Sequence, residues 1–465
     1  MSSGVGARPA KLHLRGGRIV TMNARRDVIQ ADMTITDGVI TAIGPDLPIP
    51  AGATLIDASR MTLIPGLVQI HIHLCQTLFR GLADDLLLLD WLKQRLWPLE
   101  GAHDGDSLAT SANLGLAELI RGGTTTIVDM ATVHHTERVF QAIADSGMRA
   151  ISGKCMMDVG DGVPETLMET TESSLAESIK LLDAWDGFDQ GRIRYAFTPR
   201  FAVSCTDGLM RQVAKIAAER GTYVHTHASE NLDEIALVER ERGMRNVVYF
   251  ESIGMTGPHL ILAHCVWLDA EEMAILARTG TRVAHCPSSN LKLGSGIAPV
   301  PEMLAKGISV SFGADGAPCN NNLDGFQEMR LASLIQKPVH GPTAMPAALT
   351  FELATLGGAR AIGQDDRIGS LEVGKRADVV IIDLTGLHTA PATETNVYSQ
   401  LVYAARSTDV RVTIVDGRIL FQDGKVQTID EAAVLADVPK ALARVLQRSG
   451  VDEIPLGMAS PVAIT

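Results

Sequence analysis

The feature of this sequence that most constrains its fold is a series of eight short, apolar, β-prone segments separated by helical segments. The expected strands cover residues 63–72, 124–130, 150–157, 192–198, 223–226, 260–263, 282–284 and 309–313. Segments between them, such as DSLATSANLGLAELIRGG and LMRQVAKIAAERG, have helical periodicity and end on glycine, a common helix stop. Eight strands that alternate with helices predict an α/β fold, a (β/α)8 TIM barrel over residues 63–369.

Two stretches outside this region have a different pattern. Residues 1–62 alternate apolar and polar positions between glycine turns, a pattern typical of short β-strands. The same pattern returns in residues 370–428, for example in VRVTIVDGRILFQDGKV. Because neither stretch has enough strands to bury a face alone, we expect the two to form one small β-sandwich domain. The sequence pattern of residues 429–465 predicts a C-terminal helix followed by a tail.

Side chains that can bind a metal stand at or near the ends of several apolar runs. His71 and His73 close the run PGLVQIHIHL, His225 and His227 lie in TYVHTHASEN, and Asp315 ends ISVSFGADGAP. Two histidines separated by one residue point to the same side of a strand, so one cation can take both. Barrel enzymes have their active sites at the carboxyl ends of the strands. Imidazole and carboxylate together suit zinc, and nickel, iron and manganese are alternatives.

Three more polar residues occupy similar positions. Glu230 follows the fifth expected strand, His264 the sixth and His285 the seventh. Any one of them alone is better explained as a loop, cap or core residue, because buried histidines are often satisfied by backbone groups. The whole set at strand ends favours a functional site.

Composition and charge exclude several classes of function. The formal net charge is −13 and the sequence pI is about 5.5, so nucleic acid and anionic membrane surfaces are poor partners. We expect a cytoplasmic protein, since neither a signal peptide nor an apolar stretch of membrane-spanning length is evident. The six cysteines have no C-x-x-C spacing and are expected to be reduced. Phosphate-loop, G-x-S-x-G and compact zinc-deaminase motifs are missing from the sequence.

The motifs taken together resemble the amidohydrolase superfamily, and within it the branch of aromatic deaminases and triazine hydrolases. PGLVQIHIHL resembles the first-strand metal motif, with Gln69 where Asn or Asp is more usual, and HASE resembles the H-x-x-E motif. Further resemblances are LILAHCVWL to the sixth-strand motif, AHCPSSNLKLGSGIAPV to the segment after the seventh strand, FGADGAPCNNNLD to the eighth-strand motif, and RIGSLEVGKRADVVIIDL to the return into the small domain. The resemblance covers nearly the whole chain.

The resemblance implies a metal site. It implies one divalent ion, zinc first and Fe2+, Ni2+ or Mn2+ as alternatives, bound by His71, His73, His227 and Asp315. Binuclear members of the family add a carbamylated lysine on the fourth strand, but the expected fourth strand, RIRYAFTPR, has none. Lys154 falls on the third, so we expect one metal and a structural or rim position for Lys154.

The resemblance also implies catalytic roles. A divalent ion lowers the pKa of bound water toward neutrality. Asp315 is expected to accept the water proton, Glu230 to protonate a ring nitrogen, and His264 to hold the water. This predicts a metal-dependent hydrolytic deaminase that releases ammonia from an amino-substituted purine, pterin or triazine-like ring. Deamination of S-adenosylhomocysteine or methylthioadenosine, and triazine chlorohydrolysis or aminohydrolysis, are the alternatives.

Three residues are predicted to bind the substrate. Gln76 and Arg200 resemble positions in guanine deaminases, and His285 joins them. If the amide and guanidinium bind a ring carbonyl, an amino-oxo heterocycle is preferred over a thioether nucleoside. In the competing interpretation, Arg200 pairs with a carboxylate and Gln76 caps a loop. The expected partners are a small heterocycle and water, and a homo-oligomer is compatible with these features.

Overall fold

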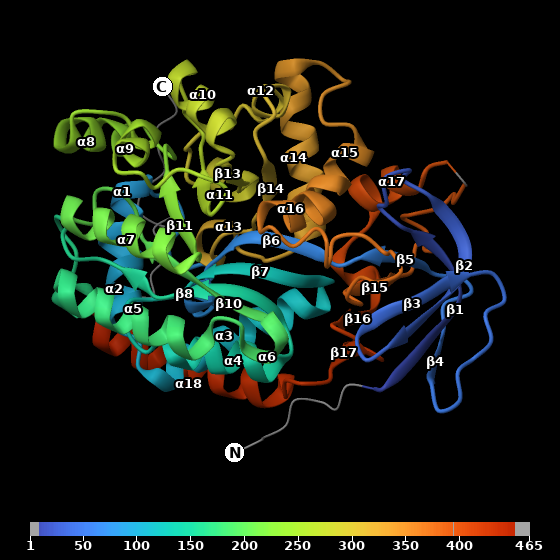
Figure 1. The fold of residues 1–465 in the computed structure, drawn as a ribbon. Helices are drawn as coiled ribbons and strands as arrows, with labels where there is room; N and C mark the ends of the chain where they lie inside the picture. Colours follow the sequence, from blue (N-terminus) through green and yellow to red (C-terminus); the bar gives the residue numbers. More distant parts are fainter. Residues whose placement is uncertain (1–8, 394, 452–465) are drawn as a thin grey trace, which may run out of the picture.

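The computed structural model describes residues 9–393 and 395–451, which form two nine-stranded sheets with helices around one of them (Figure 1). The first sheet is a barrel with the order β6-β7-β8-β10-β11-β12-β13-β14, and all of its paired strands are parallel. A parallel bridge between Ile72 and Asp315 links the last strand region back to the first. The expected (β/α)8 barrel is therefore confirmed.

The barrel strands have the following bounds: β6 Leu67–Ile72, β7 Thr124–Met130, β8 Arg149–Gly153, β10 Ile193–Pro199, β11 Tyr223–Ala228, β12 Leu260–His264, β13 Arg282–His285 and β14 Val310–Phe312, with the short β9 Cys155–Met156 beside β10. The longer helices are α3 Gly105–Arg121, α4 Thr136–Ser146, α5 Thr171–Trp185, α7 Asp207–Arg220, α8 Leu232–Arg242, α10 Ala270–Thr279 and α14 Gly325–His340. Several end as the sequence predicted: Gly221, which follows α7, adopts the left-handed conformation that ends a helix.

Shorter helical segments connect these elements. They are η1 Leu74–Phe79, α1 Leu88–Trp91, η2 Leu92–Leu96, α2 Trp97–Gly101, η3 Glu165–Leu167, α6 Phe188–Gly191, α9 Asn246–Ser252, α11 Pro287–Lys292, α12 Val300–Ala305, α13 Ala317–Asn320, α15 Ala347–Glu352, η4 Leu353–Gly357, α16 Gly358–Ala361, α17 Val397–Ser399, η5 Gln400–Ala404 and η6 Ser407–Asp409. The segment from η1 to α2 follows the first barrel strand and supplies part of the pocket wall described below.

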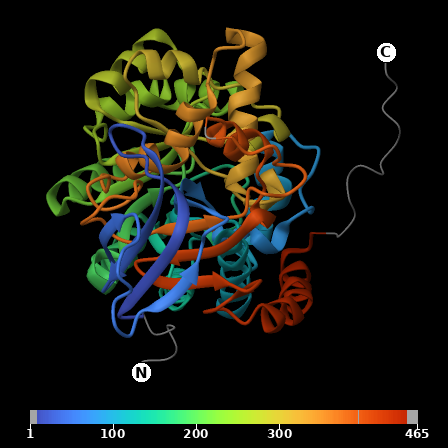
Figure 2. The ribbon, with the colours of Figure 1, turned by 90° about the vertical axis from the view of Figure 1, so that its right-hand side faces the viewer.

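The second sheet combines strands from both ends of the chain (Figure 2). Its strands are β1 Lys11–Val20, β2 Val28–Thr36, β3 Val39–Gly44, β4 Thr54–Asp57, β5 Thr62–Pro65, β15 Val379–Ile382, β16 Val410–Val415, β17 Arg418–Gln422 and β18 Lys425–Val426. Antiparallel pairing of β5 with β15 joins the two halves. The sheet also folds back on itself, as the hydrogen bond from Ala377 N to Gly38 O at 2.9 Å shows. It encloses its own apolar cluster. The division into separate domains at the expected boundaries remains a proposal.

Two of the expected strands are each divided into two strands in the structure. The segment 63–72 is two strands, since β5 pairs in the terminal sheet and β6 in the barrel. The expected boundary at residue 62 therefore falls inside β5. Gly66 marks the crossing, where a Cβ atom would collide with the side chain of Thr125. The segment 150–157 is likewise divided into β8 and β9.

The expected C-terminal helix is α18, Glu431–Ser449, which lies along the outside of the barrel near α3 (Figure 1). Arg448 Nη1 donates to Asp104 Oδ2 at 2.8 Å and Thr110 Oγ1 donates to Asp437 Oδ2 at 2.6 Å. Residues 452–465 of the expected tail lie outside the described residues. In the part of the chain that is described, no helix is both long and apolar enough to cross a membrane.

Candidate metal and catalytic site

An irregularity in β6 places the first two histidines inside the barrel. Val68 and Ile70 belong to an apolar cluster that includes residues of β7, β8 and β12, whereas Leu67 and Ile72 belong to the larger cluster that includes the surrounding helices. The register with β7 shifts between Gln69 and Ile72. Such a bulge interrupts the alternation of side chains, and the His71 ring is directed toward the β11 histidines.

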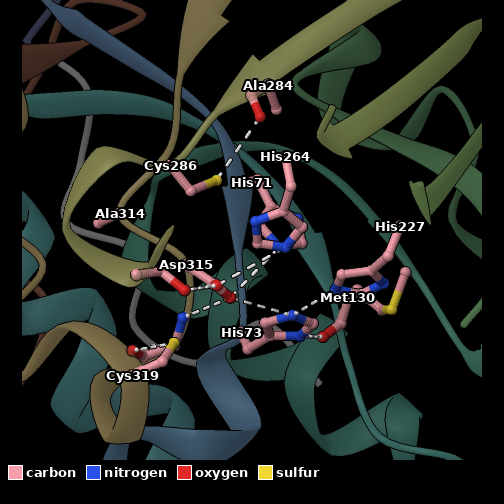
Figure 3. A network of polar contacts seen from close by, with 12 residues as sticks. His71, His73, Met130, His227, His264, Ala284, Cys286, Ala314, Asp315 and Cys319 are labelled. Atoms are coloured by element: carbon pink, nitrogen blue, oxygen red, sulfur yellow. Dashed lines mark hydrogen bonds and ion pairs between the residues drawn. The ribbon is translucent and has the colours of Figure 1, made fainter. Parts of the chain in front are cut away.

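Hydrogen bonds to carbonyl groups fix two of the rings. His73 Nδ1 donates to Met130 O at 2.8 Å, and His227 Nδ1 donates to Arg200 O at 2.7 Å. A carbonyl oxygen can only accept, so each neutral ring has its hydrogen on Nδ1 and a lone pair on Nε2. The two Nε2 atoms are 3.3 Å apart. Figure 3 shows the rings of His73 and His227 beside those of His71 and His264.

Asp315 completes the group from the loop after β14. Its Oδ1 atom lies 3.2 Å from His71 Nε2 and 3.4 Å from His73 Nε2. Ser289 Oγ donates to Oδ2 at 2.6 Å, and the residue has a positive φ of 63°. Although burial alone would raise it, the pKa of Asp315 is held well below its usual value by the neighbouring imidazoles, His71 first. A positive charge among these imidazoles therefore keeps Asp315 ionised.

These side chains fit a divalent cation. Burial lowers the pKa values of His71, His73 and His227, that of His73 to about 4, so the rings are neutral at pH 7. Lone pairs of the rings and a carboxylate oxygen then face one another, which is unfavourable without a positive charge between them. His71 Nε2 is buried and makes no hydrogen bond within the described residues. The potential ligand atoms of the three rings lie within 4.8 Å of one another, as do those of His71, His264 and Asp315.

Glu230 and His264 lie next to this group. His264 Nδ1 donates to Asn290 Oδ1 at 2.8 Å, and its Nε2 atom lies 3.4 Å from Glu230 Oε2 and 3.9 Å from Asp315 Oδ2. Burial raises the pKa of Glu230 to about 7. A carboxyl with that pKa can both donate and accept a proton near neutral pH.

A small pocket opens onto these residues. Its wall combines the polar group with apolar side chains; the lining residues are His73, Gln76, Leu88, Trp91, Leu92, Arg200, Phe201, His227, Glu230, Glu234, His264, Leu293 and Asp315. Two polar atoms of this wall, Gln76 Oε1 and Trp91 Nε1, are buried and without a hydrogen-bond partner within the described ranges. They offer one acceptor and one donor to a ligand.

Arg200 and Gln76 reach the pocket wall, but both also bind Glu100. Arg200 donates to Glu100 Oε2 at 2.6 Å and Oε1 at 3.3 Å, and Gln76 Nε2 donates to Oε1 at 2.8 Å. The structure thus shows the carboxylate pairing of Arg200 that was the competing interpretation. Glu100 was missed by the sequence analysis, since a single glutamate in WPLE carries no signal that distinguishes it from a solvated charge.

His285 and Lys154 lie apart from the pocket. His285 is fully buried and does not belong to the pocket wall, and its role in substrate binding stays a prediction. Lys154 forms an ion pair with Glu169 and lies 4.0 Å from Glu177. The ion pair with Glu169 compensates the charge of buried Lys154, as expected for a structural residue.

Other contacts of the site could not be read from the sequence. The carbonyls of Met130 and Arg200, the amide of Asn290 and the hydroxyl of Ser289 each orient one site residue. Backbone carbonyls leave no trace in a sequence. Asn290 and Ser289 stand in PSSN, where turn and helix-start functions are an equally good explanation.

Comparison with known proteins establishes the family. The model of the amidohydrolase family matches residues 62–420, and the chain belongs to this family. A 5'-deoxyadenosine deaminase of Methanothermobacter thermautotrophicus is 40% identical over 407 residues, 87% of this chain and 92% of that protein. A 5-methylthioadenosine/S-adenosylhomocysteine deaminase of Moorella thermoacetica is 40% identical over 414 residues, 88% of this chain and 94% of that protein.

Solved structures agree with this result. An adenosine deaminase from Xanthomonas campestris with bound zinc has a TM-score of 0.87 at 32% identity and covers 94% of this chain and 98% of its own. A guanine deaminase from E. coli has a TM-score of 0.82 at 30% identity, covering 89% and 100% of the two chains. A triazine hydrolase, with a TM-score of 0.87 at 24% identity over 93% and 99%, shares the fold.

Proposed function

We propose that this protein is a metal-dependent hydrolytic deaminase of 6-aminopurine nucleosides, the adenosine derivatives. The observation that carries the proposal is the placement of Glu230, whose carboxyl has a pKa of about 7, beside His264 and Asp315 at the wall of one pocket. The names of the relatives from Methanothermobacter thermautotrophicus and Moorella thermoacetica support adenosine derivatives as the substrate class.

The residues of the chain have complementary tasks in this reaction. Protonated Glu230 donates its proton to a ring nitrogen, which makes the amino-bearing carbon more electrophilic. The lone pair of His264 Nε2 and the carboxylate of Asp315 accept hydrogens of the attacking water. The water oxygen bonds to the carbon as Asp315 takes one of its protons. That proton then passes to the amino group, the C–N bond breaks, and ammonia leaves. A divalent ion held by His71, His73, His227 and Asp315 supplies Lewis acidity, with zinc as the proposed ion.

The surroundings of the pocket favour an adenosine derivative over a carbonyl-bearing base. The guanidinium of Arg200 is paired with the carboxylate of Glu100 through two of its nitrogens, so its charge is already compensated without a ring carbonyl. Trp91 Nε1 remains available to donate to a purine ring nitrogen, and Gln76 Oε1 to accept from the amino group of the purine. The apolar side chains of the wall suit the faces of the ring.

The test is ammonia release by the zinc-loaded protein. The substrates would be adenosine, 5'-deoxyadenosine, methylthioadenosine and S-adenosylhomocysteine, with guanine, a pterin and an aminotriazine as the competing ring classes. We expect the highest kcat/KM for one of the four nucleosides, and a kcat lower by about a hundredfold or more with Glu230→Gln. A clear preference for guanine or a triazine would contradict the proposal.

A further inference from the structure

His225 contacts a proposed metal ligand without belonging to the ligand set. It lies in β11, two residues before His227, and its side chain is fully buried. Its Nε2 atom is 2.7 Å from His71 Nδ1, and its Nδ1 atom is 3.1 Å from Ile261 O in the neighbouring strand β12. Three groups from three barrel strands thus form one chain of hydrogen bonds.

The direction of these hydrogen bonds follows from the last acceptor, the carbonyl oxygen of Ile261. The carbonyl of Ile261 can only accept, so His225 has its hydrogen on Nδ1. A neutral imidazole has one N–H group, which makes His225 Nε2 an acceptor. His71 must then donate from Nδ1, and its lone pair is on Nε2, the atom that faces Asp315.

His71 differs in this respect from the other two rings. Backbone carbonyls orient His73 and His227 directly. Every residue has a backbone carbonyl, so a side-chain substitution does not remove these acceptors. The Nδ1 atom of His71 instead meets the side chain of His225, which a substitution can remove. On its other side His71 is close to the strand region after β14, where a Cβ atom at Gly313 would lie 2.7 Å from His71 Cβ.

We infer that His225 is a positioning residue that keeps the lone pair of His71 Nε2 directed at the metal. Without an acceptor at position 225, His71 is free to place its hydrogen on Nε2, where it blocks coordination. Partners that orient a ligating histidine typically change metal affinity about 10–100-fold. The inference rests on the metal site of the proposed function, and it concerns metal affinity rather than the substrate.

The experiment is a zinc titration of metal-free protein against a chromophoric chelator. His225→Phe retains a ring but has no acceptor, and we expect it to bind zinc about 10–100-fold more weakly than the wild type. His225→Gln offers an amide oxygen to His71 Nδ1 and should restore most of the affinity. His13→Phe is the matched control, because His13 is also fully buried but lies in β1 of the terminal sheet, and its zinc affinity should equal that of the wild type.

Three outcomes are decisive. Equal zinc affinity in His225→Phe and the wild type would overturn the inference, as would equal losses in His225→Gln and His225→Phe. A wild-type protein that binds no zinc would instead refute the metal site itself. If His225→Phe fails to fold, nitrogen-15 spectra of histidine-labelled, metal-free wild type answer the question: both His71 and His225 should have a protonated Nδ1 and an unprotonated Nε2, and a protonated Nε2 in either ring would refute the inference.

Discussion

The buried pair of Arg200 and Glu100 allows a prediction that separates structural support from substrate binding. The exposed fractions of the two side chains are 4% and 1%. Removing one partner of such a pair leaves an uncompensated buried charge, which typically costs about 3–5 kcal/mol. Arg200→Met and Glu100→Gln should each lose about that much free energy of unfolding. The backbone carbonyl that orients His227 remains in Arg200→Met, so the loss comes from the charge.

The double variant distinguishes the two roles. Arg200→Met with Glu100→Gln has no buried charge at this position, and it should be more stable than the sum of the single losses implies, by about 1–3 kcal/mol. If Arg200 also contacts the substrate, kcat/KM stays low in the double variant although its stability recovers. If Arg200 only pairs with Glu100, activity recovers together with stability.

The assay is urea unfolding of metal-free protein, followed by tryptophan fluorescence, because bound metal would add its own stabilisation. Arg211→Met is the control. Arg211 and Asp207 form an ion pair of similar length, 2.7 Å against 2.6 Å, but their side chains are 55% and 47% exposed. Exposed pairs contribute about 1 kcal/mol or less. The reasoning is refuted if Arg200→Met loses no more than this control, or if the double variant loses the full sum of the single losses.

Four further predictions follow from the site and the fold. His71→Ala should lose metal and activity together, measured by elemental analysis and ammonia release; full metal occupancy in this variant would exclude the proposed ligand set. Glu230→Gln should keep the metal and lose about a hundredfold or more in kcat, the usual scale for acid–base catalysis, and near-normal turnover would exclude that role. Burial raises the pKa of Glu234 from its ordinary 4.5 to about 8. The folded protein therefore retains a proton that the unfolded chain loses, and its stability falls as pH rises from about 4.5 through 8. Glu234→Gln, whose amide can pair with Asn246, should reduce that fall in urea unfolding of metal-free protein at pH 5 and pH 8.5, and an unchanged pH dependence would contradict the assignment. Deleting residues 1–62 or 370–428 should give insoluble protein, because each removes strands from one shared sheet; a soluble, active fragment of residues 63–369 would disprove that dependence.

The sequence by itself determined the type of fold and the set of groups available for chemistry. Eight apolar segments that alternate with helices require a parallel sheet covered by helices, and the barrel has this form. His71, His73, His227 and Asp315 could be selected in advance because strand ends converge at one face of a barrel, and the structure brings them together. Both results depend on local patterns, which a sequence contains.

The tertiary structure decided how these groups are used. Whether Arg200 meets a ligand or a carboxylate depends on Glu100, one hundred residues away. Which nitrogen of His71 carries the lone pair depends on His225 and on a backbone carbonyl of β12. The bulge in β6 and the passage of β5 into the other sheet depend on pairing with distant strands. Partner choice, protonation and register arise from contacts between segments far apart in the chain, and a local pattern carries no information about which distant atom will face a side chain.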